Sequence, residues 1–305
     1  MGSEAPAPEL GRVLRVSGLL QLVRIGDRVL RCEMRGRLKD GRRTTTAPVY
    51  VGDWVRVRPT GRWSGVIESV QPRTSSISRC ASGGRGRQQI IAVNIDQLVV
   101  IVVLRRPAVR PGFIDRAIIM GSQGGARVVV CVNKIDLGDG AELADLVRTY
   151  GGLGYSVLGT SAVTGDGIEA LGALIAGCTS AFVGQSGVGK SSLLNCLEPG
   201  LNLRTQELMR RHERGRHTTA AAQLHELRSG GWVVDTPGIK ELGLWNVGVD
   251  SLAEHFVEMR PYVGSCRFGD CRHLEEPGCA VLDAVHRGAI SPRRYAGYRR
   301  ILESL

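Results

Sequence analysis

A glycine-rich segment at residues 184–191 (GQSGVGKS) restricts the possible folds of this chain more than any other part of the sequence. It follows an apolar run at 181–183 and opens a helical stretch at 191–197. Its glycines let successive backbone N–H groups surround a phosphate at a helix N-terminus, where the helix dipole is positive. Lys190 can then reach the β- and γ-phosphates of a nucleotide, and the Ser191 hydroxyl can ligate Mg²⁺. The segment therefore predicts an α/β nucleotide-binding domain. The expected contacts come from Gly184, Gln185, Ser186, Gly187, Val188, Gly189, Lys190, Ser191 and Ser192.

Continuous apolar runs separated by helical stretches indicate how this domain is built. Runs without polar alternation are typical of strands in a parallel sheet that is covered by helices on both faces. The expected strands lie at 97–104, 127–132, 156–158, 181–183 and 232–234, and the expected helices at 141–150, 168–176 and 191–197.

An acidic tetrapeptide at 235–238 (DTPG) directly follows one of these runs. A carboxylate that ends a strand beside a phosphate loop can hold the Mg²⁺ shell, and a nearby glycine N–H can sense the γ-phosphate. We assign these roles to Asp235 and Gly238. The next residue is Ile239, and its alkyl side chain cannot orient a water molecule as a glutamine would.

A second tetrapeptide, 133–136 (NKID), predicts which base is bound. A carboxylate at Asp136 can accept hydrogen bonds from N1–H and the exocyclic amine of guanine, whereas adenine lacks this pair of donors. The stem of Lys134 can lie over the purine ring, and a backbone N–H at 161–162 can bind guanine O6. The expected guanine contacts are Asn133, Lys134, Ile135, Asp136, Ser161 and Ala162.

The order of these motifs along the chain is unusual. The guanine motifs at 133–136 and 160–162 precede the phosphate loop and the tetrapeptide at 235–238, whereas ordinary GTPases have the phosphate loop first. All of the motifs still follow strands, and α/β sheets bind ligands at the carboxyl ends of their strands. The order therefore indicates a circular permutation of an intact site.

The N-terminal quarter of the chain differs in both pattern and charge. Residues 10–80 alternate apolar and polar side chains between turn signals such as 26–27 and 40–41, which predicts a small antiparallel β-barrel. Residues 1–80 carry 15 basic and 7 acidic side chains, and so hold +8 of the net charge of +11. An acidic polymer such as a nucleic acid is the natural partner of such a surface, and a basic surface without a specific partner is an equal alternative from charge alone.

The eight cysteines fall into two groups. Three of them lie within 14 residues of the C-terminal region together with one histidine, and three thiolates with an imidazole suit a closed tetrahedral Zn²⁺ site. The expected structural zinc ligands are Cys266, Cys271, His273 and Cys279. The other five are isolated in apolar surroundings, and we expect them to be core residues: Cys32, Cys80, Cys131, Cys178 and Cys196.

The remaining sequence features concern where in the cell the protein is located. The longest apolar run, at 98–104, is far shorter than the ~20 residues of a membrane span, so we expect no contact with a membrane. The first residues lack the basic and apolar regions of a secretory signal. We therefore expect a cytoplasmic protein.

The chain resembles the small ribosomal subunit biogenesis GTPases of the RsgA type over nearly its whole length. Besides the segments above, the resemblance rests on VGDWV at 51–55, PRTS at 72–75, SAVTGDG at 161–167, GRHTT at 215–219 and EPGCAV at 276–281. It implies an OB-fold barrel at 1–88, a circularly permuted GTPase domain at 89–247 and a helical zinc-binding domain at 248–305.

The resemblance also implies an activity and partners. Such relatives bind the 30S subunit and its 16S rRNA and assist late maturation, and the subunit stimulates their hydrolysis of GTP to GDP and phosphate. By the same resemblance, His217 positions water or stabilises charge, although an RNA contact is an equal alternative. Thr218 or Thr219 would complete the Mg²⁺ shell, and Thr219 is the expected ligand. We expect a monomer.

Two other classes of function remain open from the sequence. The chain could be an RNA-binding scaffold whose nucleotide pocket is a switch with negligible hydrolysis. It could also be an ATPase or a kinase that acts on a small molecule. Guanine selectivity and turnover distinguish the three classes.

Overall fold

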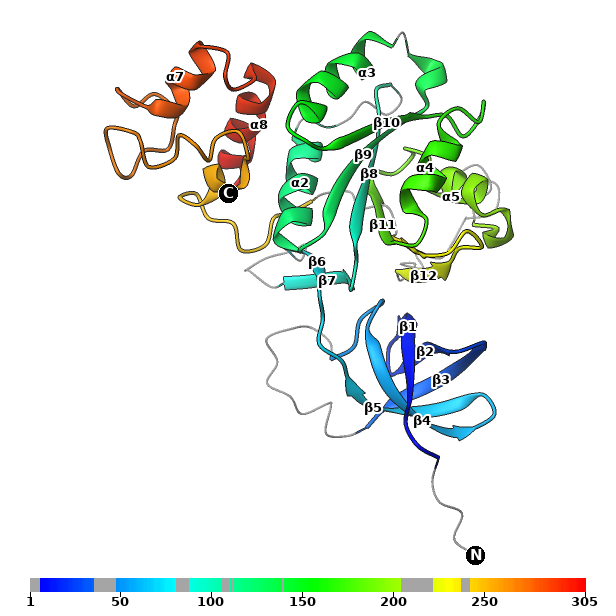
Figure 1. Ribbon diagram of the computed structural model, residues 1–305. Helices are drawn as coiled ribbons and strands as arrows, with labels where there is room; N and C mark the ends of the chain where they lie inside the picture. The colour runs from blue at the N-terminus through cyan, green and yellow to red at the C-terminus, as the bar shows by residue number, and fades with distance from the viewer. Residues whose placement is uncertain are drawn as a thin grey trace, which may run out of the picture.

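The computed structural model describes residues 6–35, 48–80, 88–105, 110, 112–138, 140–203, 222–236 and 242–305. Figure 1 shows three parts: a β-barrel in blue, a central sheet with helices in green, and a C-terminal part in orange and red. Among the described residues, no helix combines the length and apolar character that crossing a membrane requires.

The N-terminal part is a closed barrel. Its strands are β1 (Glu9–Ser17), β2 (Leu20–Ile25), β3 (Arg28–Met34), β4 (Trp54–Gly61) and β5 (Ser64–Val70). The β1–β2, β2–β3, β4–β5 and β1–β4 pairs are antiparallel, and β3 pairs with β5 in parallel, so the ring closes in the order of an OB-fold. Alternate side chains point inward and form a buried core of Val13, Val23, Leu30, Cys32, Val55, Val57 and Ile67. The expected barrel is confirmed.

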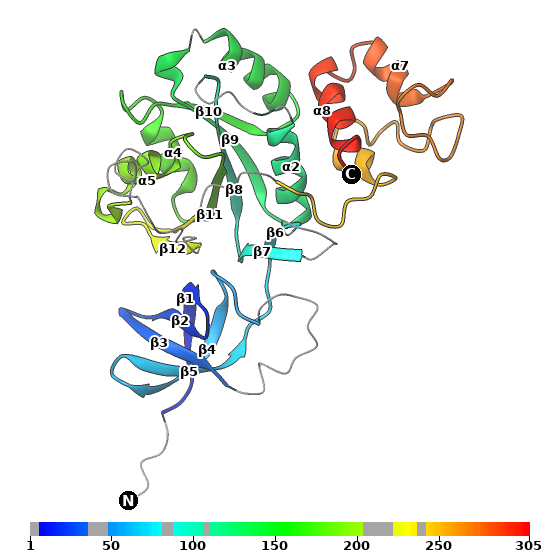
Figure 2. The same cartoon turned by 180° about the vertical axis from the view of Figure 1, so that it is seen from behind.

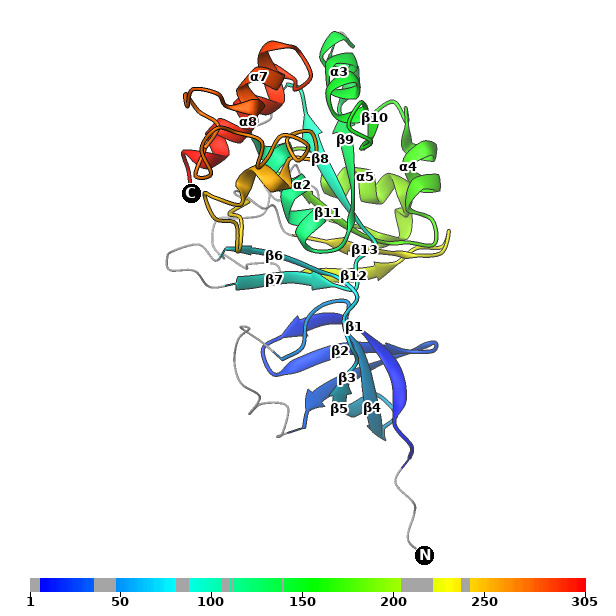
Figure 3. The ribbon, with the colours of Figure 1, turned by 60° about the vertical axis from the view of Figure 1, so that its left-hand side comes forward.

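A separate hairpin follows the barrel. β6 (Ser76–Cys80) pairs with β7 (Gln88–Val93) in a two-stranded sheet. At its two ends the Ser76 amide donates to the carbonyl of Gly124 and the Cys80 amide donates to that of Gly243. The hairpin thus joins the central domain to the segment that leads into the C-terminal part (Figure 3).

The central sheet has the strand order β10-β9-β8-β11-β13-β12. Its strands are β8 (Gln97–Val103), β9 (Arg127–Asn133), β10 (Ser156–Thr160), β11 (Thr179–Gly184), β12 (Gln223–Glu226) and β13 (Trp232–Asp235). Neighbours pair in parallel, except that β12 is antiparallel to β13. The chain starts at the middle of the sheet with β8, moves outward to β10, and returns to β11 beside β8. The order of the sheet therefore reverses between β8 and β11, and such a switch point is where open α/β sheets bind ligands.

Helices cover both faces of this sheet. Leu98, Val100 and Val102 of β8 pack under α2 (Phe113–Gln123) and α3 (Ala141–Leu146), which continues as the π turn η2 (Val147–Gly151). The alternate residues Val99, Ile101 and Val103 pack under α4 (Ile168–Ile175) and α5 (Lys190–Leu197). Every residue of β8 is buried, which explains its uninterrupted apolar sequence. Short 3-10 turns, η1 (Ile135–Leu137) and η3 (Pro199–Leu201), follow β9 and α5.

The C-terminal part contains η4 (Leu252–His255), α7 (Ala280–His286) and α8 (Pro292–Leu302) around its own core. Ile119 of α2 belongs to this core, and α8 contacts α2 directly. Seen from behind, the C-terminal part lies beside α2, on the side of the sheet away from α4 and α5 (Figure 2).

One expectation about the cysteines is wrong. Of the five isolated cysteines, Cys32 and Cys131 are buried, but Cys80 and Cys178 are half-buried and Cys196 is exposed. Cys196 lies near the end of the short helix α5, where its apolar neighbours in sequence point to the opposite side. Local apolar composition therefore does not establish burial at a helix surface.

Candidate nucleotide and metal sites

The phosphate loop lies at the switch point between β8 and β11. It begins at Gly184, the last residue of β11, and leads into α5. Gly187 and Gly189 adopt positive φ values of 87° and 93°. A Cβ on Gly189 would also overlap the side-chain amide of Asn133, so this position requires glycine on two grounds.

Lys190 is the buried cation of this loop. Its Nζ donates to the carbonyls of Gly184 at 2.8 Å and Gln185 at 3.3 Å. Burial lowers the pKa of Lys190 to about 8, an effect that the charge of Asp235 partly offsets. Burial likewise raises the pKa of Asp235, and Lys190 opposes that rise. The two buried groups thus interact electrostatically near the carboxyl ends of β11 and β13, and an anion together with Mg²⁺ would offset the cost of burying both charges.

A further donor in the loop lacks a partner. Gln185 is buried, and among the described residues its Nε2 has no hydrogen-bond acceptor. Together with the Lys190 ammonium, this leaves the loop rich in donors, as a phosphate site requires. The residues present therefore fit a nucleotide phosphate.

The guanine motif is tied directly to the phosphate loop. Asn133 ends β9, and its Nδ2 donates to the carbonyl of Val188 at 2.8 Å. Lys134 donates from Nζ to the carbonyl of Gly187 at 2.7 Å, and its own backbone has a positive φ of 61°. Positive φ at a non-glycine residue is strained, and such strain is concentrated at functional sites. These bonds place the base site and the phosphate site in a fixed relation.

Asp136 and Ser161 come together from two strand ends. The Ser161 hydroxyl donates to the Asp136 carboxylate at 2.6 Å, while its oxygen accepts from the amides of Val163 and Thr164. The two amides fix the orientation of the hydroxyl, so its proton is directed at the carboxylate. Asp136 is thereby held at the carboxyl edge of the sheet with an oxygen available for a ligand.

The expected Mg²⁺ ligands are described only in part. Ser191 lies in the first turn of α5 and Asp235 ends β13. The neighbouring Thr236 hydroxyl donates to the carbonyl of Phe182 at 2.6 Å, which ties β13 to β11 where the ion would sit. His217, Thr218, Thr219 and Gly238 lie outside the described residues.

The four expected zinc ligands converge. The donor atoms of Cys266, Cys271, His273 and Cys279 all lie within 4.8 Å of one another. The Cys266 and Cys279 sulfurs are 3.9 Å apart, and each is within 3.5 Å of Nδ1 of His273. Two sulfurs bound at ~2.3 Å to a tetrahedral ion stand about 3.8 Å apart, so the cluster has the dimensions of a zinc site.

Two features hold the histidine of this cluster in place. His273 has a positive φ of 58°, and the hydroxyl of Tyr295 on α8 donates to its carbonyl at 2.8 Å. The Glu276 carboxylate accepts backbone N–H bonds from Arg272, Leu274 and Glu275 at 2.8 to 3.0 Å. Burial raises the pKa of Glu276, but the backbone donors outweigh it and lower the pKa to about 2.

The sequence did not predict several contacts that support these sites. The Thr160 hydroxyl donates to Oδ1 of Asn133 at 3.2 Å and so fixes which way the Asn133 amide faces. Thr160 comes directly before Ser161, and this adjacency was the available signal. Nothing in the sequence indicates the contact of Tyr295 with His273, because 21 residues separate them.

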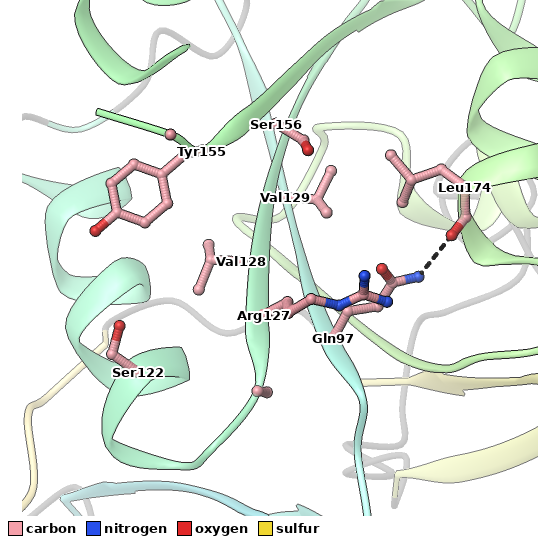
Figure 4. A pocket seen from close by; sticks show the side chains of 10 residues that line it. Gln97, Ser122, Arg127, Val128, Val129, Tyr155, Ser156 and Leu174 are labelled. Carbon is pink, nitrogen blue, oxygen red and sulfur yellow. Dashed lines mark hydrogen bonds between the residues drawn. The ribbon is translucent and has the colours of Figure 1, made fainter. Parts of the chain in front are cut away.

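A pocket of about 330 Å³ lies away from these motifs (Figure 4). Its lining includes Gln97, Arg127 and Ser156, at the amino ends of β8, β9 and β10. The side-chain amide of Gln97 donates to the carbonyl of Leu174 at 3.1 Å, the bond drawn in Figure 4. The pocket therefore occupies the edge of the sheet opposite to the nucleotide site.

Known proteins agree with this architecture. A profile of the family described as RsgA GTPase matches residues 70–245. The small ribosomal subunit biogenesis GTPases RsgA of Gemmatimonas aurantiaca and Moorella thermoacetica are both 41% identical, covering 89% and 96% of each chain respectively.

Solved structures show the same permuted fold. The crystal structure of YjeQ from Thermotoga maritima superposes with a TM-score of 0.77 and 33% identity, covering 98% of both chains. That of YloQ, described as a circularly permuted GTPase, superposes with a TM-score of 0.74 and 25% identity, covering 100% of this chain and 97% of YloQ. The expected permutation is confirmed. The chain therefore belongs to the RsgA GTPase family, and it is a GTP hydrolase with a circularly permuted GTPase domain.

Proposed function

We propose that this GTPase binds the 30S ribosomal subunit through 16S rRNA and assists its late maturation, hydrolysing GTP to GDP and phosphate with stimulation by the subunit. Family membership makes it a GTPase of ribosome biogenesis, and the relatives in Gemmatimonas aurantiaca and Moorella thermoacetica are named for the small subunit. The observation that carries the proposal is the attachment of a basic barrel to the guanine-nucleotide domain.

The nucleotide is bound between two loops in this proposal. Asp136 accepts hydrogen bonds from the guanine edge, and Ser161 holds that carboxylate in place. Lys134 lies over the base, and the backbone N–H of Ala162 binds O6. At the other end, the amides of residues 185–190 and the Lys190 ammonium bind the β- and γ-phosphates.

Hydrolysis requires charge stabilisation and a positioned water. When bound, Mg²⁺ neutralises charge on the β- and γ-phosphates. Ser191 and Thr219 would ligate it, with Thr218 as the alternative, and Asp235 would hold its water shell. His217 would position the attacking water, since Ile239 cannot, and Gly238 would bind the γ-phosphate.

The three parts of the chain have separate roles. Residues 1–88 bind rRNA, residues 89–247 bind and hydrolyse GTP, and residues 248–305 are organised by one structural Zn²⁺. A closed Cys₃His set has no open coordination position and so supports a structural role. We expect the protein to act as a monomer in the cytoplasm, where its proposed partner is assembled.

Turnover measurements test the proposal. GTP hydrolysis is measured with and without purified 30S subunits, with 50S subunits as the control. We expect slow basal turnover, because the alkyl side chain of Ile239 cannot position the attacking water, and a rise of at least about tenfold with 30S alone. Equal rates in all three conditions would contradict the stimulation by the subunit. ATP turnover as fast as GTP turnover would contradict the guanine assignment.

A further inference from the structure

The β4–β5 hairpin of the barrel carries an exposed aromatic side chain. Trp63 lies in the turn between the two strands, and 58% of its surface is exposed. Trp54 on β4 is less exposed, at 37%, and the buried Arg12 guanidinium lies over its ring. Trp63 is therefore the most exposed aromatic side chain among the described residues of the barrel.

The hairpin fixes the backbone from which this side chain projects. Gly61 and Ser64 pair across the turn, and the Thr60 hydroxyl donates to the Ser64 hydroxyl at 3.1 Å. The Trp63 carbonyl accepts from the amide of Arg31 on β3 at 2.9 Å. A rigid aromatic ring loses little conformational entropy when it binds a partner, unlike a side chain on a mobile loop.

Positive charge flanks the ring. The Arg62 guanidinium lies over it, 5.3 Å from the ring centroid, and Arg31 is exposed on the adjacent strand. Within the described ranges, neither guanidinium is recorded within 4 Å of a carboxylate. By contrast, Arg35 and Arg58 on the same side of the barrel both reach Glu68. The two cations beside Trp63 thus keep their charge available for an anionic partner.

This combination matches one kind of ligand. Proteins that bind single-stranded nucleic acid stack bases on exposed aromatic rings and neutralise the backbone with arginine and lysine. In OB-folds the loop between the fourth and fifth strands is one of the loops that bind oligonucleotides. Arg62 covers part of the Trp63 ring, and the exposed remainder can receive a base.

We propose that Trp63 is a stacking platform for an unpaired base of RNA, with Arg62 on its other face and with Arg31 and Arg62 at the adjoining phosphates. The inference rests on the proposed function, since it specifies how the barrel recognises rRNA. It limits the recognised class to single-stranded or looped RNA, because a base within a duplex has no free face. Sequence preference at this position is weak, since every base has a π face.

Binding of an oligouridylate dodecamer to the full chain tests the platform. Binding is followed by quenching of the protein's tryptophan fluorescence and, separately, by the fluorescence anisotropy of a labelled dodecamer. We expect Trp63→Ala and Trp63→Leu to weaken binding at least about fivefold, the lower end for loss of one base–aromatic stack. Trp63→Phe keeps a π face, so it should retain affinity within about threefold while most of the quenching disappears. Arg62→Gln should weaken binding and reduce the salt dependence by about one charge.

Controls separate this inference from the proposed function. Val147→Ala changes an exposed apolar residue outside the barrel and should leave binding unchanged. Basal GTP turnover of every variant should equal that of the wild type, which shows that the chain is folded. Undiminished dodecamer binding by Trp63→Ala, or equal binding by the Leu and Phe variants, would overturn the platform. Loss of 30S binding with intact dodecamer binding would overturn it in favour of a protein contact. Intact stacking without 30S-stimulated turnover would instead contradict only the proposed function.

Discussion

We expect the selectivity of this site for guanine to depend on Asp136. Its carboxylate accepts a hydrogen bond from the Ser161 hydroxyl and lies at the carboxyl edge of the sheet, where the guanine donors would bind. An amide in its place presents a donor where a charged acceptor is needed. We expect Asp136→Asn to weaken GDP binding at least about 100-fold, since hydrogen bonds to charged groups contribute ~1.5–3 kcal/mol each. Xanthine carries a carbonyl in place of the exocyclic amine, so binding of XDP should improve.

Equilibrium titration with both nucleotides measures this change. Glu142→Gln removes an exposed carboxylate from the first turn of α3 and serves as the matched control, with unchanged affinity. Parallel loss of GDP and XDP binding would show that Asp136 supports the fold of the loop instead of reading the base.

Lys190 illustrates a conflict between stability and function. Burial lowers the pKa of Lys190 to about 8, below its usual value near 10.5. Between these values the unfolded chain binds more protons than the folded one, so this residue makes stability rise as pH increases from about 8 to 10.5. Below pH 8 the buried charge costs ~3 kcal/mol, by order of magnitude.

We therefore expect Lys190→Met to stabilise the nucleotide-free protein at pH 7 by up to ~3 kcal/mol and to abolish GTP binding. Denaturant midpoints of the variant and the wild type are compared at pH 7, 9 and 10.5. Taking the difference between the two proteins cancels the contribution of the other titrating groups. The difference should shrink as pH rises. A variant that is less stable than the wild type at pH 7 would contradict the assigned cost of this charge.

The sequence predicted the helices and strands whose residue pattern is local. β8, β9 and β11 were recognisable because both of their faces are buried, and α4 and α5 because they follow strand ends. β12 was not predicted, since its four residues, QLHE, have no pattern of their own. It exists as a strand because it forms a hairpin with β13 and pairs with β1 of the barrel, and the contact with β1 is remote in sequence.

The same distinction applies to the candidate sites. The zinc cluster and the nucleotide motifs were predicted by spacing, because their ligands lie within short segments that turn on themselves. The bond from Thr160 to Asn133 and that from Tyr295 to His273 cross between elements. Such contacts depend on how strands and helices pack, and no single-segment pattern encodes them.

The loop at 266–279, which carries the four candidate metal ligands, is stabilised by the carboxylate of Glu276, which is not one of those ligands. Glu276 accepts three backbone N–H bonds and so fixes the turn that holds His273 at positive φ. We expect Glu276→Gln to weaken zinc retention about tenfold or more, as found for residues that orient metal ligands, because an amide oxygen is a weaker acceptor than a carboxylate. Competition with a chromophoric chelator measures the affinity. Glu275→Gln changes the exposed neighbour and should retain zinc like the wild type.

Buried arginines join the barrel, the central domain and the C-terminal part of the molecule. Arg12 of the barrel lies between Trp54 and Trp232, about 5 Å from each ring centroid, and donates to Thr179 at 2.8 Å. These contacts fix the barrel to the amino ends of β11 and β13, whereas the phosphate loop leaves the carboxyl end of β11. The barrel is therefore connected to the nucleotide site along these strands and through β12, which pairs with both β1 and β13.

The C-terminal part is attached by a second buried arginine. Arg294 of α8 is 1% exposed and bonds to Asp115 of α2 and to Glu258, while Tyr150 donates to Asp115 at 2.9 Å. Removal of Arg294 would leave two buried carboxylates without their cation. Breaking a buried ion pair in this way costs ~3–5 kcal/mol.

The adjacent residue provides a matched comparison. Arg293 pairs with Asp145 at an exposed site, and such a pair contributes at most ~1 kcal/mol. We expect Arg294→Met to release the C-terminal part from α2 and Arg293→Met to leave it attached. Small-angle scattering and limited proteolysis near residues 242–250 measure the attachment, with zinc content confirming that the released part keeps its own fold. Since α8 and the bond from Tyr295 to His273 both belong to the part that is released, Arg294→Met and Arg293→Met should both retain zinc like the wild type. Equal behaviour of the two variants would show that apolar packing of α8 against α2, and not the buried charge, holds the two parts together.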